Sequence, residues 1–340
     1  MPDKGTLQGW LERSWFGGRR VPWLKPLALL FAGITGLRRS LYRRGWLASH
    51  RSCVPVVVVG NISVGGTGKT PLVIWLAIRL REQGRRAGVV LRGYGGSTRG
   101  PVLVTASSDP REVGDEALLI ARRTGCPVAV GARRSAAAAL LESQGCDLLI
   151  SDDGLQHLAM RRDLEIVVVD GVRGVGNGAL LPQGPLREGT ARLRSVDAVV
   201  INGPDATALA ASLRNPLHMS LGEAVLRSLV TDQIEPLDGL RGAQVHAVAA
   251  TGNPARFFAQ LRGLGCRPIE HPFPDHYQFQ PGELAFGDEP VVMTEKDAVK
   301  CRPFATGRML YLQVSAVLPD DGSARLMGMV QACITKGTHT

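Results

Sequence analysis

The glycine-rich stretch at residues 60–71 constrains the fold of this chain more than any other feature of its sequence. It reads G-N-I-S-V-G-G-T-G-K-T-P and follows the apolar run at 54–59, which has the composition of a buried parallel strand. The run at 70–81 reads as a helix, with Pro71 in its first turn, where proline is tolerated. A strand, a glycine-rich loop and a helix in this order predict a phosphate-binding loop, because backbone N–H groups and the helix N-terminus point at the phosphates.

This loop departs from the usual phosphate-binding pattern, G-x-x-x-x-G-K-[ST], at its first glycine position. Counting back from Lys69 places Ser63 there. The later glycines still allow the backbone to approach phosphate closely. Lys69 would reach the β- and γ-phosphates, and the hydroxyl of Thr70 would ligate Mg²⁺. We therefore expect the nucleotide to be bound by six consecutive residues: Gly65, Gly66, Thr67, Gly68, Lys69 and Thr70.

Composition and charge exclude several classes of protein. The chain has 340 residues, 44% of them hydrophobic and 21% charged, which is typical of a folded globular protein of about two domains. Its six scattered cysteines form no C-x-x-C pair and read as reduced thiols of a cytosolic protein. Eight of the ten net positive charges lie in residues 1–52. This distribution argues against nucleic-acid binding, which would spread basic residues over a folded domain.

The first fifty residues combine basic side chains with four of the five tryptophans. Their uncharged run, at 26–37, is twelve residues long, whereas a helix that spans a bilayer needs about 20. Tryptophan together with clustered Lys and Arg is typical of a segment that lies on an anionic membrane surface. The alternative is an amphipathic helix packed on its own domain with its basic face in water. We expect residues 1–50 to form a membrane-associating helical segment.

Apolar strand-like runs alternate with helical runs through the rest of the chain. This alternation predicts an α/β fold with a doubly wound parallel sheet of the P-loop NTPase type. A later strand at 245–250, followed by T-G-N-P at 251–254, indicates a second, smaller α/β lobe. We place the nucleotide-binding core at 51–235 and the second lobe at 236–340. The strands expected in the core after the first lie at 86–91, 127–131, 146–151, 165–170 and 196–202.

Ligands bind at the carboxyl ends of the strands in such sheets, so polar residues at these ends are candidates for the site. Asp152 and Asp153 follow the strand at 146–151, as in the second half of a P-loop site, where a carboxylate holds Mg²⁺. Either of the two could touch the metal. Asp115 and Glu116, in V-G-D-E just before an apolar helix, are catalytic or metal-binding candidates, or simply the N-terminal cap of that helix.

Phosphoryl transfer also needs groups that neutralise charge and that deprotonate or orient the acceptor. Asp115 and His276 are candidates for deprotonation, and the arginines at 133, 134 and 187 are candidates for neutralisation. Arg92 and Tyr94 could hold a phosphate or a hydroxyl, or only shape a turn. The motif T-E-K-D at 294–297 differs from the N-K-x-D of guanine-binding loops, so guanine specificity is rejected.

These motifs together resemble the tetraacyldisaccharide 4′-kinases of lipid A biosynthesis. The resemblance covers about residues 50–300, and the basic, aromatic N-terminus is similar to the membrane-associated helix of that family. The motifs that carry it occur in the family's order: G-N-I-S-V-G-G-T-G-K-T-P (60–71), R-G-Y-G (92–95), V-G-D-E (113–116), S-D-D-G-L-Q-H (151–157), L-P-Q-G-P-L-R-E (181–188), T-G-N-P (251–254), F-P-D-H-Y (273–277) and T-E-K-D (294–297).

The resemblance implies a kinase that uses ATP and Mg²⁺ to phosphorylate the 4′-hydroxyl of a tetraacylated glucosamine disaccharide 1-phosphate, forming a lipid IVA-type intermediate. It would work at the cytoplasmic face of the inner membrane of a Gram-negative bacterium, with no nucleic acid and no obligate protein partner. The family's catalytic aspartate corresponds to Asp115 and its histidine partner to His276, and closure of the second lobe would complete the site. The expected roles are catalytic for Asp115, His276, Lys69 and Asp153, substrate-binding for Arg92, Tyr94, Arg133 and Arg187, and metal-binding for Thr70, Asp152 and Glu116.

Two other functions remain open at this point. One is a P-loop kinase for a different lipid or sugar alcohol. The other is a nucleotide-switched assembly or metal-insertion protein, since the same style of loop serves those proteins. Such proteins usually carry Cys or His metal ligands or a partner-binding switch, and neither is evident in this sequence.

Overall fold

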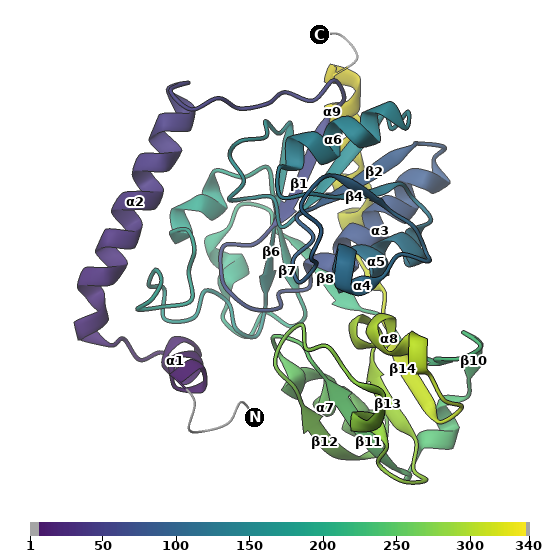
Figure 1. The fold of residues 1–340 in the computed structure, drawn as a ribbon. Coiled ribbons are helices and arrows are strands. Elements are labelled where there is room, and N and C mark those ends of the chain that lie inside the picture. The colour runs from purple at the N-terminus through teal and green to yellow at the C-terminus, as the bar shows by residue number, and fades with distance from the viewer. Residues whose placement is uncertain (1–6, 338–340) are drawn as a thin grey trace.

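A nine-stranded, mostly parallel sheet forms the centre of the first lobe (Figure 1). The computed structural model describes residues 7–337. The strand order is β15-β8-β7-β6-β1-β5-β2-β4-β3, and only the edge pairs β3/β4 and β15/β8 are antiparallel. The strands are β1 (Val56–Gly60), β2 (Ala87–Leu91), β3 (Val102–Val104), β4 (Val128–Val130), β5 (Leu148–Asp152), β6 (Leu164–Asp170), β7 (Ala198–Asn202), β8 (Leu217–Leu221) and β15 (Ala316–Val317).

The register of the central strands sets up the site. Strand β1 is buried along its whole length between β5 and β6, as its β-branched residues predict for a parallel strand covered on both faces. Val59 of β1 lies opposite Asp152 of β5, and Gly60 lies opposite Val167 of β6. The glycine-rich loop after β1 and the carboxylates after β5 therefore meet at one edge of the sheet.

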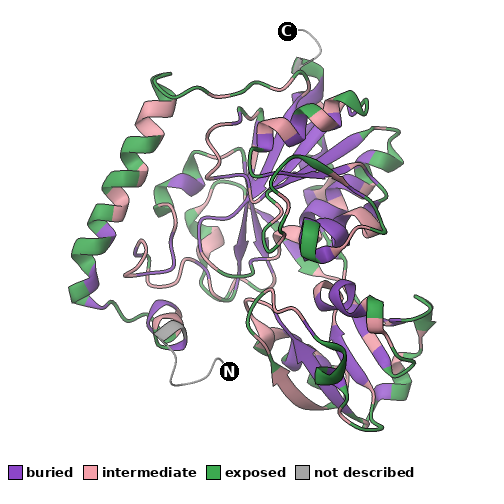
Figure 2. Ribbon diagram, viewed as in Figure 1, coloured by how far each residue is buried: buried purple, intermediate pink, exposed green. Residues whose placement is uncertain are grey.

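Helices cover both faces of this sheet, so the expected doubly wound α/β fold is confirmed. Apolar side chains of α3, α5 and α9 pack with the strands in one core, and those of α6 pack in a second core on the opposite face. Figure 2 shows that both cores enclose almost completely buried strands. The helices of this lobe are α3 (Lys69–Glu82), α4 (Pro110–Val113), α5 (Asp115–Thr124), α6 (Arg134–Ser143) and α9 (Asp320–Gly337).

The second lobe is built on a six-stranded sheet with the order β10-β9-β14-β13-β11-β12. Strands β12, β11, β13 and β14 are parallel to one another, and β9 and β10 add an antiparallel edge beside β14. The elements of this lobe are β9 (Val225–Ser228), β10 (Ile234–Glu235), β11 (Gln244–Ala249), α7 (Pro254–Gly263), β12 (Arg267–Pro272), β13 (Val291–Thr294), α8 (Glu295–Cys301) and β14 (Met309–Gln313).

The division of the chain differs from the expected boundary at residue 235 in two ways. Residues 225–235 already belong to the second sheet, and β15 and α9 return to the first lobe, where Leu326 and Val330 are completely buried in its core. The alternation of strands and helices along the sequence cannot show either feature. An antiparallel edge strand and a returning helix have the same local pattern in whichever lobe they pack.

Two N-terminal helices lie beside the first lobe, α1 (Leu7–Phe16) and α2 (Lys25–Arg43). In Figure 1, α2 runs along one side of the lobe, and Figure 2 shows most of its surface exposed. Of its residues only Ala28 is buried. Within residues 7–337, no helix is both long enough and apolar enough to cross a bilayer.

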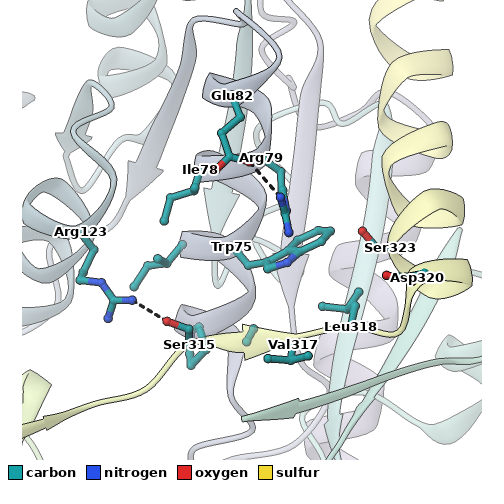
Figure 3. Close-up of a pocket in the computed structure, with 13 residues that line it drawn as sticks. Trp75, Ile78, Arg79, Glu82, Arg123, Ser315, Val317, Leu318, Asp320 and Ser323 are labelled. Atoms are coloured by element: carbon teal, nitrogen blue, oxygen red, sulfur yellow. Dashed lines mark hydrogen bonds and ion pairs between the residues drawn. The ribbon is translucent and has the colours of Figure 1, made fainter. Parts of the chain in front are cut away.

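Arg123, near the end of α5, joins the two lobes at the point where the chain returns from the second to the first. Its guanidinium forms an ion pair of 2.6 Å with Glu295 at the start of α8 and donates a hydrogen bond of 2.9 Å to Oγ of Ser315, just before β15. Figure 3 shows the latter bond beside a cavity of about 300 Å³ that Trp75 of α3 also lines. Burial raises the pKa of Glu295, and the charge of Arg123 opposes that rise.

We expect Arg123→Ala to destabilise the protein by about 3 kcal/mol, because it leaves the buried carboxylate of Glu295 without its counter-charge. Urea unfolding would measure the loss. Arg308→Ala is the matched control, since it breaks an exposed ion pair with Asp288, and it should cost less than about 1 kcal/mol. Equal losses in the two variants would show that the Arg123 pair does not join the lobes energetically.

Candidate functional site

The glycine-rich turn between β1 and α3 is held in shape by the neighbouring strand ends. Gly65 and Gly68 have φ values of +99° and +92°, in the region that favours glycine. A methyl group at Gly68 would also collide with Nδ2 of Asn202, at the end of β7. That amide donates a hydrogen bond of 2.9 Å to the carbonyl of Thr67. Two of the expected glycines are thus required by backbone geometry and close packing.

Ser63, which occupies the position of the missing first glycine, is buried and lies in a backbone bridge. It pairs in antiparallel fashion with Leu186, and the next amide, of Val64, donates 2.9 Å to the carbonyl of Pro185. The residue therefore has ordinary backbone geometry that accepts a side chain. In this chain the loop at 181–188 supports the start of the glycine-rich turn.

Lys69 and two arginines surround Asp153, which follows β5. The ammonium of Lys69 is 3.4 Å from its carboxylate, and Nη1 of Arg187 is 3.2 Å from it. Nη1 of Arg134 donates a hydrogen bond of 2.9 Å to the carbonyl of Asp153. Burial favours the neutral acid, but Lys69, Arg187 and Arg134 outweigh it, so the pKa of Asp153 lies below its ordinary value. The site thus gathers several cations around one carboxylate.

Asp152, the neighbouring carboxylate, has the opposite environment. Its side chain is 3% exposed, and burial, reinforced by the charge of Glu116, raises the pKa of Asp152 to about 7. Its Oδ1 is buried and accepts no hydrogen bond from the described residues. A divalent cation bound here would coordinate Oδ1 of Asp152. Its charge would also offset the repulsion between the carboxylates of Asp152 and Glu116.

The donor set is one that fits Mg²⁺. Among residues 7–337 no three His, Cys, Asp or Glu side chains converge as a self-contained metal cage. Mg²⁺ is usually held by one or two carboxylates together with phosphate oxygens and water, and not by such a cage. Asp152, Glu116 and the hydroxyl of Thr70 at the start of α3 are ligands of this kind.

Asp115 and His276 come from different lobes and form a hydrogen-bonded pair. Nδ1 of His276 is 3.1 Å from each carboxylate oxygen of Asp115. Asp115 is the first residue of α5 and is 3% exposed. Gly114, with φ +88°, makes the sharp turn before it, and a side chain there would press on the carbonyl of Tyr94. The ring of Tyr94 lies against that of His276, with centroids 4.8 Å apart.

Two lysines of α8 complete the surroundings of this pair. Nζ of Lys296 donates hydrogen bonds to Asp275 (3.2 Å) and Glu116 (3.3 Å) and is 3.9 Å from Asp115. Nζ of Lys300, almost fully buried, is also 3.9 Å from Asp115. Burial opposes ionisation of Asp115, but its hydrogen bond with His276 and the lysine charges outweigh burial and lower its pKa. These contacts therefore favour the ionised form of the buried Asp115 carboxylate.

The second lobe also lies close to the glycine-rich turn. A methyl group at Gly252, in the T-G-N-P turn after β11, would lie 3.4 Å from the backbone nitrogen of Gly66. Arg256 of α7 is 3.6 Å from Asp170 at the end of β6. The carboxyl edges of the two sheets therefore face each other across the candidate site.

The structure brings most of the predicted site residues to this edge. One difference is that Arg134, and not the neighbouring Arg133, reaches Asp153. Arg133 is exposed at the N-terminal end of α6, whereas Arg134 is 5% exposed and reaches Asp153. Arg92 and Tyr94 follow β2, and both are exposed. Arg92 is one of the four arginines that, after burial, lower the pKa of His157 to about 4.

Sequence reasoning missed the role of Lys296 and Lys300 in this arrangement. It used T-E-K-D to reject guanine binding and as one motif of the family resemblance, and gave neither lysine a role in the site. The signal that could have found them is the rule applied to the first lobe: T-E-K-D begins at the last residue of an apolar strand, β13, and therefore lies at a carboxyl end.

The pKa shifts of the Asp115–His276 pair predict a pH-dependent contribution to stability. Burial lowers the pKa of His276, but the hydrogen bond with Asp115 outweighs it, and the net shift is upward. The histidine contribution is therefore complete below the unfolded pKa of about 6.5 and is lost as pH rises through the folded value. The aspartate contribution, with a lowered pKa, is present above about pH 4 and is lost in acid.

We therefore expect His276→Gln to lower the thermal unfolding midpoint most near pH 5.5 and least near pH 9. His271→Gln is the control with the opposite sign, because burial lowers the pKa of His271 and its protonation opposes folding. That variant should gain stability relative to the unaltered protein as pH falls. A constant difference across pH for His276→Gln would contradict the charged pair.

Comparisons with known proteins place these features in one family. A family model described as tetraacyldisaccharide-1-P 4′-kinase matches residues 20–331. A tetraacyldisaccharide 4′-kinase from Alkalilimnicola ehrlichii is 55% identical over 311 residues, covering 90% of this chain and 91% of that protein. One from Nitrosococcus oceani is 48% identical over 341 residues, covering 99% and 98%.

A solved structure has the same overall fold. It is the "apo" form of LpxK from Aquifex aeolicus in complex with ATP, with a TM-score of 0.75 and 27% sequence identity. The match covers 92% of this chain and 99% of that one, so both lobes are included.

Proposed function

The chain belongs to the tetraacyldisaccharide-1-P 4′-kinase family, and from this premise we propose that Asp115 is the base of its phosphoryl transfer. The activity itself is that of an ATP-dependent kinase of lipid A biosynthesis, which phosphorylates the 4′-hydroxyl of a tetraacylated disaccharide 1-phosphate. One observation carries the assignment of the base. Asp115 is a buried carboxylate kept ionised at the edge where the phosphate-binding turn lies.

ATP binds at the glycine-rich turn in this proposal. The backbone N–H groups of residues 65–70 and the N-terminus of α3 surround the phosphates, and Lys69 moves from Asp153 to the β- and γ-phosphates. The ion pair with Asp153 keeps the lysine beside the turn until the nucleotide arrives. The ATP complex of the Aquifex aeolicus relative supports nucleotide binding by this fold.

Mg²⁺ would be held by Thr70, Asp152 and Glu116. The support for this assignment is the unpartnered Oδ1 of Asp152 and its raised pKa, which Mg²⁺ would reverse. When bound, the cation would neutralise charge on the β- and γ-phosphates. Asp153 and Arg187 then complete the polar wall around the phosphate chain.

Asp115 acts as the base during transfer of the γ-phosphoryl group to the sugar. Asp115 accepts the proton of the 4′-hydroxyl as the 4′-oxygen bonds to the γ-phosphorus, and the bond between that phosphorus and the β,γ-bridging oxygen breaks, releasing ADP. His276 orients the carboxylate through its hydrogen bonds of 3.1 Å. Lys296 and Lys300 are positioning residues that keep Asp115 ionised before it takes the proton.

Exposed residues beside the Asp115–His276 pair contact the sugar headgroup. Tyr94 packs against His276 and is exposed, so its ring is available to a sugar. Arg92, with Arg133, offers exposed guanidinium groups for the anionic substrate. Approach of the second lobe, whose Gly252 already lies close to Gly66, excludes water from the γ-phosphate.

A membrane surface supplies the acceptor, and α2 is the element that contacts it. Leu27, Leu30, Ile34 and Leu37 are spaced by three and four residues, so they form one stripe of the helix, and each is more than half exposed. Arg38 and Arg39 follow and contact the first lobe at Gln156 and Glu188. An exposed apolar stripe followed by arginines fits the interface of an anionic membrane.

A substrate with four acyl chains stays in the bilayer, so the kinase has to reach it there. Because ATP is cytoplasmic, this contact is made at the cytoplasmic face of the inner membrane. The contacts of Arg38 and Arg39 join the membrane-facing helix to the loops around Asp153 and Arg187. The helix and the catalytic edge are thus adjacent parts of one surface.

We expect Asp115→Asn to reduce the rate of lipid phosphorylation by about 10²–10⁴-fold, because the proton acceptor is removed while the shape is kept. ATP binding should be unchanged in this variant. The assay contains ATP, Mg²⁺ and the disaccharide 1-phosphate in detergent. Asp109→Asn, at the exposed start of α4, is the matched control and should keep full activity. Near-normal turnover by Asp115→Asn would rule out the assigned base.

We expect the double substitution Leu30→Glu and Ile34→Glu to weaken binding to vesicles of phosphatidylglycerol and phosphatidylethanolamine by about 100-fold or more. Each glutamate removes a side chain that would be buried in lipid. Co-sedimentation measures the partition. Ile234→Glu replaces a comparably exposed isoleucine of the second lobe and should bind as the unaltered protein does. Equal binding by all three proteins would contradict a membrane contact through α2.

A further inference from the structure

Arg173 lies beside the phosphate-binding turn without belonging to any of the motifs used so far. It follows β6, whose last residue, Asp170, fixes the local turn: its Oδ1 accepts hydrogen bonds of 2.9 Å from the backbone nitrogens of Val172 and Arg173. The half-buried side chain of Arg173 extends toward the turn. A methyl group built on Gly65 would lie 3.4 Å from Nη1 of Arg173.

The charge of Arg173 has no counter-charge in the part of the chain that the structure describes. Lys69 and Arg187 both pair with Asp153, whereas the guanidinium of Arg173 forms no ion pair and no hydrogen bond with residues 7–337. A half-buried guanidinium next to a phosphate-binding backbone is suited to an anion that arrives from outside. Phosphate oxygens match the planar donor fork of arginine.

An aromatic ring of the N-terminal segment holds this guanidinium. Cζ of Arg173 lies 4.7 Å from the ring centre of Phe16, the last residue of α1. Such a cation–π contact fixes the side chain without using any of its N–H donors. The donors therefore remain available to a ligand.

The helix that carries Phe16 is itself fixed to the loop after Arg173. Nε1 of Trp15 donates 3.0 Å to the carbonyl of Pro182, and the backbone nitrogen of Asn177 donates 2.7 Å to the carbonyl of Trp15. The same loop continues to Pro185, whose carbonyl accepts a hydrogen bond from Val64 in the phosphate-binding turn. The end of α1 and the phosphate-binding turn are thus both hydrogen-bonded to the loop at 177–185.

We propose that Arg173 is a further phosphate-binding residue of the nucleotide site, and that Phe16 is the positioning residue that presents it. The ligand is the phosphate chain of the nucleoside triphosphate. This inference rests on the proposed nucleotide site and extends it to the end of α1. Through Phe16, the segment next to the membrane-facing helix contributes to the binding of ATP.

The direct test is the equilibrium dissociation constant of radiolabelled ATP with Mg²⁺, measured on the full-length protein in detergent without lipid acceptor. Arg173→Ala should weaken binding by about 10-fold, the scale of one charge-assisted contact. Arg173→Lys should recover part of the loss. Arg20→Ala is the matched control: Arg20 donates a hydrogen bond to the carbonyl of Asn177 in the same loop but does not reach the turn, so ATP affinity should stay unchanged. Unchanged affinity in Arg173→Ala would overturn the proposal.

The role of Phe16 is tested by a double-substitution cycle. Phe16→Leu keeps an apolar side chain but removes the π face, and it should weaken ATP binding severalfold, whereas Phe16→Tyr should restore it. In the background of Arg173→Ala, Phe16→Leu should have no further effect on the dissociation constant. An equal loss in both backgrounds would show that Phe16 acts only on the fold. Thermal unfolding midpoints identify any variant that has lost its structure, and such a variant is replaced by Phe16→Met.

Kinetics separate this inference from the proposed function. Arg173→Ala should raise the KM for ATP and leave the KM for the lipid acceptor unchanged. Lys69→Ala tests the nucleotide site itself. If Lys69→Ala loses ATP binding and Arg173→Ala does not, only the inference about Arg173 fails. If Lys69→Ala keeps full ATP affinity, the proposed nucleotide site fails as well.

Discussion

The ionised carboxylate of Asp115 is the group around which the two lobes are arranged. Burial alone raises its pKa, since a charge in a low-dielectric interior is disfavoured. The first lobe places it at the start of α5, and the second lobe supplies the charges and the hydrogen bond that keep it ionised, through His276, Lys296 and Lys300. The ionised state of this carboxylate therefore depends on contacts across the interface between the two lobes.

Helix α5 contacts the second lobe near both of its ends. Its first residue is Asp115, and near its other end Arg123 pairs with Glu295, the first residue of α8. The lysines that approach Asp115 come from the same α8. Two short helices from different lobes are thus joined at both ends by charged contacts. A shift of α8 that breaks the pair at Arg123 also withdraws the cations from the carboxylate.

Sequence patterns were sufficient where function depends on local backbone geometry. The strand, the glycine-rich turn and the paired aspartates at the end of β5 appear where their patterns predict, because each depends on a short stretch of chain. The patterns were insufficient where side chains meet across the lobes. The sequence around Lys296 and Lys300 of α8 does not show how close they lie to Asp115. Only the three-dimensional arrangement shows that Arg173, beside Gly65, has no counter-charge among residues 7–337. The single-residue choice between Arg133 and Arg134 depends on the helical rotation at the start of α6, which sequence does not resolve.

The return of the chain to the first lobe has a consequence for synthesis on the ribosome. Leu326, Val330 and Ile334 of α9 fill the same core as the central strands, yet they are translated after the whole second lobe. A nascent first lobe therefore exposes an open apolar face on its sheet while the second lobe, whose strands are contiguous in sequence, can already fold. The core of the first lobe can therefore be completed only after α9 has been translated.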